Sequence, residues 1–250
     1  MPRSNLNNSW ALVTGGGTRV GAVIARELAD AGYSVLVHYC TNRRGADSVS
    51  NSIRESGRRA EVVQANLIHR DDVLRLASTT SEIAAGELGL LVHNAACFER
   101  RDTSTLLSTP DDESWNRAMA LNVTAPYMLT TALAKELKRK RGCVVAIACT
   151  SAFHPWPSYL AYSVSKAALV HLVKGLSVAM APDVRVNAVA PGTVMLPEEC
   201  QEIEKERLLS KIPLRRIGDP ADVARAVRFI AENDYITGHT IVIDGGRVQA

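Results

Sequence analysis

Short apolar runs alternate with longer amphipathic segments from one end of the chain to the other. The short runs predict strands, and the longer segments, in which apolar residues recur every three or four positions, predict helices. We expect strands at Trp10–Thr14, Ser34–Tyr39, Ala60–Ala65, Leu88–His93, Cys143–Ala148, Val184–Ala190 and Thr240–Ile243. We expect helices at Arg19–Ala31, Ala46–Ser56, Asp71–Ala85, Glu113–Lys140 and Tyr159–Met180.

Several predicted strands are apolar at every position, as in Val35–Val37 and Val144–Ile147. A strand with this composition is typical of a parallel sheet that helices cover on both faces. Strand–helix alternation sustained over the whole chain indicates βαβ units with right-handed crossovers. The predicted fold class is therefore α/β: a single-domain, Rossmann-type, doubly wound parallel sheet of about seven strands with helices on both faces.

No linker rich in Pro, Gly or Ser interrupts residues 1–250, so we expect one domain. Residues 195–215 are polar, fit no core element and follow the Pro191-Gly192 turn. Segments of this kind often close over a substrate, and we predict a mobile substrate lid here.

Composition excludes several classes of protein. The net charge is only +3 and the basic residues are spread along the chain, which argues against a nucleic-acid surface. The N-terminus lacks a signal peptide, and no apolar stretch has the length of a membrane span. Five cysteines without a Cys-x-x-Cys pair, and six histidines without ligand spacing, predict neither disulfides nor a metal site. We expect a cytoplasmic protein that binds neither nucleic acid nor membrane.

A glycine-rich loop, Thr14-Gly15-Gly16-Gly17-Thr18-Arg19-Val20-Gly21, joins the first predicted strand to the first predicted helix. Glycines allow a tight turn close to a pyrophosphate, and the helix N-terminus offers unpaired N–H groups. This context predicts a dinucleotide site that includes Gly15, Thr18, Arg19 and Val20.

The end of the second strand predicts which dinucleotide binds. An acid there would bond the ribose 2′-hydroxyl of NAD, but the chain reads His38-Tyr39-Cys40-Thr41-Asn42-Arg43-Arg44. Together with Arg19, these donors suit a 2′-phosphate, since guanidinium binds phosphate bidentately. The alternative for Arg43 and Arg44 is an exposed helix start. We predict the cofactor NADP(H), with NADPH preferred over NADH.

A candidate catalytic pair follows the fifth strand. Tyr162 and Lys166 are four residues apart on a predicted helix and therefore share one face. A phenol titrates too high to exchange protons readily at neutrality, and a neighbouring cation is expected to lower its pKa.

With these motifs the sequence resembles the short-chain dehydrogenases/reductases over nearly its whole length. The matching residues are the Thr14–Gly21 loop, Asn94-Ala95-Ala96, Asn122, Tyr162 with Lys166, Pro191-Gly192, and the segment Tyr235–Gly246. The resemblance implies that Tyr162 transfers the proton, that Lys166 holds the nicotinamide ribose, and that Asn122 anchors a water in a proton relay. It also implies cofactor binding by His38, Tyr39, Asn66, Asn94, Ala95, Tyr162, Lys166, Pro191, Gly192 and Val194.

One position departs from the family pattern. Thirteen residues before the tyrosine, where the family has a substrate-orienting serine, this chain has Cys149. A thiol is a weak hydrogen-bond donor. Either Cys149 performs this role poorly, or Thr150 or Ser151 replaces it, or the substrate needs less help. A small apolar filler at the strand end is the further alternative.

Three features resemble the pteridine reductases, which reduce pterins and folates with NADPH. They are Arg19 in the glycine loop, His38-Tyr39 at the second strand end, and Phe98 after Asn94-Ala95-Ala96-Cys97. The resemblance implies that Phe98 stacks on the pterin ring and that Cys149, Ser151 and Tyr162 also contact substrate; the alternative for Phe98 is loop packing. Against this branch, its members often carry aspartate at the position of Cys149, and Asn66 also replaces a common aspartate.

Two other functions remain open. The first is a 3-oxoacyl-[acyl-carrier-protein] reductase or another carbonyl reductase, for which Lys211, Arg215 and Arg216 would meet an acidic carrier. The second is a sensor that binds NADPH without turnover. The feature that favours it is Cys149, which stands where the family has its substrate-orienting serine. The family resemblance also implies a homotetramer, with Leu121–Leu137 and Leu160–Met180 apolar enough to form interfaces.

Overall fold

The computed structural model describes residues 9–106, 112–196 and 202–249. Within these residues, seven parallel strands form one sheet in the order β3-β2-β1-β4-β5-β6-β7. The strands are β1 Trp10–Val13, β2 Ser34–Tyr39, β3 Ala60–Gln64, β4 Leu88–His93, β5 Cys143–Ile147, β6 Arg185–Pro191 and β7 Thr240–Ile243. The predicted fold class, a single-domain Rossmann-type sheet, is confirmed.

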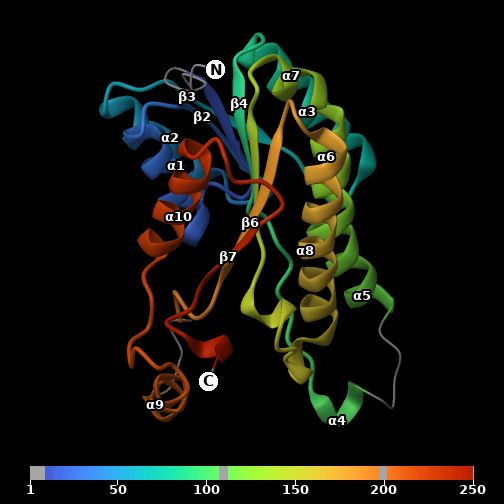
Figure 1. Ribbon diagram of the computed structural model, residues 1–250, viewed down its shortest axis with the longest axis vertical. Helices are drawn as coiled ribbons and strands as arrows, with labels where there is room; N and C mark the ends of the chain where they lie inside the picture. The colour runs from blue at the N-terminus through green and yellow to red at the C-terminus, as the bar shows by residue number, and fades with distance from the viewer. Residues whose placement is uncertain (1–8, 107–111, 197–201, 250) are drawn as a thin grey trace.

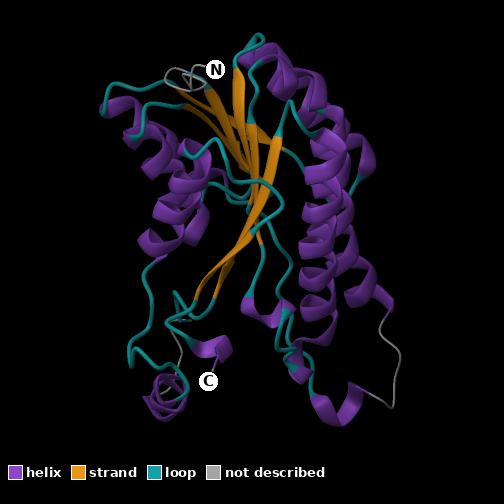
Figure 2. Ribbon diagram, viewed as in Figure 1, coloured by secondary structure: helices purple, strands orange, loops and turns teal. Residues whose placement is uncertain are grey.

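Helices cover both faces of the sheet, as Figure 1 and Figure 2 show. One face carries α1 Arg19–Asp30, α2 Arg43–Glu55 and α10 Pro220–Glu232. The other carries α3 Arg70–Ala84, α6 Ala125–Ala132, α7 Ala134–Arg139 and α8 Leu160–Met180, with α5 Asp112–Met119 beside α8. Two short helices, α4 Thr103–Leu106 and α9 Glu202–Ser210, lie at the end of the molecule where the strands finish (Figure 1).

The apolar strands are explained by this double cover. In β1, Trp10 and Leu12 enter the apolar cluster beneath α3 and α8. Ala11 and Val13, the alternate residues, enter the cluster beneath α1 and α10. Successive side chains of a strand point to opposite faces, so a strand that is buried on both sides is apolar at nearly every position.

The predicted helix Glu113–Lys140 is wrong as a single element. The chain forms α5, then a π-helical turn at Ala120–Thr124, then α6 and α7, which Leu133 separates with φ −93°. A π turn inserts an extra residue into the helical ladder, and such turns frequently lie at functional sites. Helix α10 was not predicted, although Asp219 and Asp222 form a capping box at its start.

The segment 195–215 contains α9, whereas residues 197–201 lie outside the described part of the chain. The prediction of a mobile lid there is untested.

The segment Pro157–Met180 is, by length and composition, apolar enough to cross a membrane. It forms α8 and its preceding turn, and α8 packs against β6 with Lys166, Leu169 and Val173 buried. These contacts are those of a core helix.

Between β1 and β4 the crossovers lead to opposite faces of the sheet, which opens a crevice at the carboxyl ends of these strands. Thr14 closes its floor: its Oγ1 accepts hydrogen bonds from the backbone N–H of Asn94 (2.9 Å) and of Ala95 (3.1 Å). The Asn94 side chain donates in return to the carbonyls of Thr14 (3.0 Å) and Gly15 (3.1 Å). The two strand ends are therefore fixed to each other.

Replacement of Thr14 by valine keeps the shape of the side chain but removes this acceptor. Two half-buried N–H groups then lose their partner, and we expect the free energy of unfolding to fall by about 1–3 kcal/mol in urea denaturation. The matched control is Thr131→Val on the exposed face of α6, for which we expect less than about 1 kcal/mol. Equal losses in both variants would show that Thr14 has no special role.

Candidate active site

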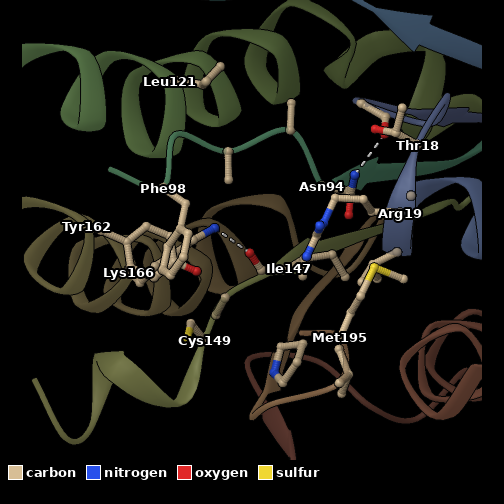
Figure 3. A pocket seen from close by; sticks show the side chains of 18 of the residues that line it. Thr18, Arg19, Asn94, Phe98, Leu121, Ile147, Cys149, Tyr162, Lys166 and Met195 are labelled. Carbon is tan, nitrogen blue, oxygen red and sulfur yellow. Dashed lines mark hydrogen bonds between the residues drawn. The ribbon is translucent and has the colours of Figure 1, made fainter. Parts of the chain in front are cut away.

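A cavity of about 850 Å³ runs along the carboxyl ends of the strands. Figure 3 shows its wall, with Arg19 and Asn94 toward one end and Tyr162, Lys166 and Cys149 toward the other. All fourteen residues predicted to bind the cofactor line it: Gly15, Thr18, Arg19, Val20, His38, Tyr39, Asn66, Asn94, Ala95, Tyr162, Lys166, Pro191, Gly192 and Val194. Phe98 and Cys149, which were predicted to contact substrate, line it as well.

The glycine loop has the close packing that a phosphate site requires. Gly15 has φ +63°, and a Cβ on Gly21 would lie 2.2 Å from the Gly15 carbonyl oxygen. The N-cap residue of α1, Thr18, makes no side-chain capping bond. The first N–H groups of α1 therefore keep their hydrogen-bonding capacity and the positive end of the helix dipole.

His38 holds the loop in place. Its Nδ1 accepts a hydrogen bond from the Gly15 backbone N–H (3.0 Å), so its Nε2 carries the proton and donates to the Ala65 carbonyl (3.0 Å). Burial lowers the pKa of His38 to about 4. The neutral imidazole thus ties the first turn of the loop to the end of β3.

The cation at the cofactor end of the cavity is Arg19. Arg43 pairs instead with Asp47 on α2 (3.3 Å), and neither Arg43 nor Arg44 lines the cavity. Arg19 has φ +50°, a conformation that favours glycine, and it places a guanidinium at the wall. At the end of β2 the described lining residues, Tyr39 to Asn42, include no acid.

The Tyr162/Lys166 pair lies where α8 meets the end of β5. Lys166 is only 2% exposed, its Nζ donates to the Ile147 carbonyl (2.7 Å; Figure 3), and burial lowers its pKa to about 8. Lys166 Nζ lies 5.5 Å from the Tyr162 ring centre.

The expected lowering of the tyrosine pKa is not found. Burial and then the neighbouring Cys149 thiol raise the pKa of Tyr162 well above its ordinary value. Burial has this effect because removal from water disfavours the charged phenolate.

Asn122 lies in the π turn, is buried, and does not line the cavity. Its Oδ1 accepts from the Cys97 N–H (2.9 Å), and its Nδ2 donates to the Cys97 carbonyl (3.2 Å) and to Ser165 Oγ (2.9 Å). Ser165 Oγ donates to the Tyr162 carbonyl (2.7 Å). Both amide hydrogens are used, so the Asn122 side chain joins the loop after β4 to α8.

Of the three residues considered for the serine role, only Cys149 lines the cavity. Its Sγ accepts from the Ser151 backbone N–H (3.4 Å) at the start of a 3₁₀ turn, Thr150–Ala152. Thr150 and Ser151 turn inward and their side chains are buried. Ser151 was expected to contact substrate, but the 3₁₀ turn buries its side chain and it is not among the residues that line the cavity.

An aromatic cluster forms the wall beside Tyr162. The Phe98 ring is 54% exposed, stacks on Tyr159 (centres 4.4 Å apart, 10° between planes) and meets Tyr162 edge-on (4.8 Å, 80°). Trp156 meets Phe98 edge-on at 6.5 Å.

The lining residues that sequence reasoning missed include Trp156, Tyr159 and Arg247. The density of aromatic residues between Phe153 and Tyr162 was an available signal for the first two.

Known proteins resemble the chain over its whole length. A family model described as enoyl-(acyl carrier protein) reductase matches residues 18–247. The chain is 36% identical to a 3-oxoacyl-[acyl-carrier-protein] reductase of Synechocystis over 96% of each chain. It is 33% identical to human dehydrogenase/reductase SDR family member 4, covering 98% of this chain and 89% of that one.

The solved structure of FolM alternative dihydrofolate reductase 1 from Brucella canis, complexed with NADP, superposes with a TM-score of 0.90. It is 34% identical and covers 100% of this chain and 97% of its own. This chain belongs to the short-chain dehydrogenase/reductase family, and it is an oxidoreductase of that family.

His38 should make stability depend on pH. Its folded pKa of about 4 lies below the ordinary 6.5, so between these values the unfolded chain binds a proton that the folded chain does not. The free energy of unfolding then falls as the pH drops, by about 2 kcal/mol from this residue between pH 6.5 and 5. We expect His38→Gln, which keeps an acceptor and a donor but does not titrate, to lose that much less between pH 7 and 5 in urea denaturation. His171→Gln, at an exposed site on α8, should behave like wild type. An unchanged pH dependence in His38→Gln would contradict this assignment.

Proposed function

We propose that this chain is an NADPH-dependent reductase that transfers hydride to the C=N or C=O bond of a small planar substrate, with pterins and folates as the favoured class. One observation carries the proposal. A single cavity joins a glycine loop with an arginine at one end to Tyr162, Lys166 and Cys149 at the other.

The residues fit the cofactor on the chain's own geometry. The α1 N-terminus and the glycine turn suit the pyrophosphate, while Arg19 and the acid-free end of β2 suit the 2′-phosphate. Lys166, at the far end, is placed to hold the nicotinamide ribose. When bound, NADPH supplies the hydride. Asn94, Ala95, Pro191, Gly192 and Val194 complete the cofactor side of the wall.

Tyr162 is the proposed proton donor. Its raised pKa keeps the phenol protonated at neutral pH, which suits donation to a substrate nitrogen or oxygen. The Lys166 ammonium then stabilises the phenolate that forms as the proton leaves. Cys149 lies beside the phenol and orients the substrate weakly, because a thiol donates a poor hydrogen bond.

The aromatic wall favours a flat substrate. Phe98, Trp156 and Tyr159 present ring faces and edges to the cavity, and offset stacking rewards a planar ligand there. The Brucella relative is called an alternative dihydrofolate reductase, which supports the same substrate class.

The second candidate is a 3-oxoacyl-[acyl-carrier-protein] reductase, which the identity to the Synechocystis protein favours. The basic residues expected to meet a carrier support it less. Arg216 pairs with Asp222 (3.5 Å), and Arg215 donates to the Ser210 carbonyl (2.8 Å), which leaves Lys211 exposed on this side. A sensor that binds NADPH without turnover is the third candidate.

We further propose that the protein works as a homotetramer in the cytoplasm. Val164 and Val178 are exposed on α8, which supports an interface there. The four cysteines in the described residues, Cys40, Cys97, Cys143 and Cys149, are free, which supports a reducing compartment.

Arg19→Gln tests the cofactor assignment. Loss of the guanidinium should weaken NADPH binding by about 10- to 100-fold and leave NADH binding within about 2-fold, because only NADPH carries the 2′-phosphate. The dissociation constants are measured by calorimetry, with Arg43→Gln as the control outside the cavity. An equal loss for both dinucleotides would contradict the assignment.

Tyr162→Phe tests the reaction itself. Purified protein is given NADPH with dihydropterin, dihydrofolate and acetoacetyl thioesters, and NADPH oxidation is followed. We expect turnover by the wild type and a fall in kcat of about 100-fold or more in the variant, with NADPH binding retained. Tyr235→Phe, at a site that is 98% exposed, is the control. Binding of NADPH by the wild type without turnover of any substrate would favour the sensor instead.

A further inference from the structure

The charges along the cavity are unevenly distributed. Among the described lining residues there is no aspartate or glutamate, and the cationic side chains are Arg19, Lys166 and Arg247. Arg19 lies at the glycine loop, and the Lys166 ammonium already donates to the Ile147 carbonyl. Arg247 is left at the substrate end: its guanidinium carbon lies 5.4 Å from the Trp156 ring centre, and Trp156 meets Phe98.

The fold holds Arg247 at this wall through a tight turn after β7. Gly245 and Gly246 have φ +65° and +88°, which sends the chain back over the carboxyl ends of the strands. Both oxygens of Asp244 accept backbone N–H groups, from Gly246 (2.8 Å) and from Val248 (2.7 Å). His154 Nε2, from the segment after β5, donates to the Val248 carbonyl (3.0 Å).

The guanidinium itself has donors to spare. One guanidinium nitrogen donates to Thr193 Oγ1 (2.9 Å), and the guanidinium carbon lies over the Trp156 ring. Within the described residues no carboxylate pairs with Arg247, and the nearby Asp244 uses its two oxygens to accept backbone N–H groups. Guanidinium has five N–H donors in a planar fork that matches a carboxylate, and Arg247 lines the cavity with one side-chain hydrogen bond, to Thr193, among the described residues.

We propose that Arg247 is a specificity-determining residue that binds a carboxylate on the arm of the substrate, while the Phe98 cluster receives its ring. The inference rests on the proposed function and narrows it to planar substrates that carry a carboxylate, of which dihydrofolate is an example and dihydrobiopterin is not. Arg247 does not touch the reacting atoms in this role. Its effect falls on substrate affinity rather than on the chemical step.

The test uses the full chain loaded with NADP and compares folate, which carries carboxylates, with biopterin, which carries none. Arg247→Met should weaken folate binding by about 10-fold in calorimetry and change biopterin binding by less than about 2-fold. Arg247→Lys should restore part of the affinity. In steady-state assays kcat/KM for dihydrofolate should fall by about 10-fold relative to kcat/KM for dihydrobiopterin, through a rise in the KM for dihydrofolate. Arg59→Met is the matched control, because Arg59 also lies over a tryptophan ring (Trp10, 5.1 Å) but does not line the cavity.

The possible outcomes distinguish the role of Arg247 from the proposed reductase activity. Equal losses for folate and biopterin, or no loss for either, overturn the role of Arg247, and so does failure of the wild type to bind folate. A loss confined to acetoacetyl coenzyme A, with folate unaffected, assigns the arginine to a phosphate and overturns the carboxylate. Selective folate binding that depends on Arg247, without reduction of any pterin, supports this inference while it contradicts the proposed reductase.

Discussion

The buried ammonium of Lys166 is the interaction on which the site depends. A charge that is almost completely removed from water is costly unless it is hydrogen-bonded, and Lys166 donates here to the Ile147 carbonyl at the end of β5. This bond fixes the middle of α8 to the sheet edge, and the helical repeat then fixes Tyr162 one turn earlier. Burial first, and then the Lys166 charge, lower the pKa of the neighbouring His93 to about 3, so this imidazole stays neutral. The positive charge in this part of the core is therefore confined to one atom beside the phenol.

The sheet could be predicted from the sequence, because strands that are buried on both faces consist almost entirely of apolar residues. Strands such as β1 and β5 are apolar at each position, and the chain order of strand and helix then defines the topology. The sequence was insufficient for the break in Glu113–Lys140, because a π turn preserves the apolar repeat while it shifts the ladder by one residue. Helix α10 was not predicted, although its capping residues Asp219 and Asp222 are present in the sequence. Its position in the fold depends on packing against α1, which the sequence does not record.

The residues of the site were predictable where a spacing or a loop defines them, as for Tyr162 with Lys166 and for the glycine turn. Properties that depend on the surroundings were not. The pKa of Tyr162 is raised rather than lowered, because of burial and, after it, the neighbouring Cys149 thiol. The inward turn of Ser151 comes from a 3₁₀ turn that begins at Cys149. The stacking of Phe98 on Tyr159 joins segments about sixty residues apart, and no local pattern records that contact.

In the reductase that we propose, Cys149 changes how the substrate is held. A serine at this position would fix the reacting atom with a strong hydrogen bond, whereas a thiol fixes it poorly. Orientation must then come from groups farther from the reacting bond. The described wall offers two of them, the aromatic cluster around Phe98 and the guanidinium of Arg247. A planar ring held between aromatic side chains has two faces and several rotations available, and a single charge contact at the end of its arm removes most of these alternatives. The weak donor Cys149 and the cation Arg247 thus belong to one arrangement. In it, the aromatic cluster holds one end of the substrate and the guanidinium holds the other.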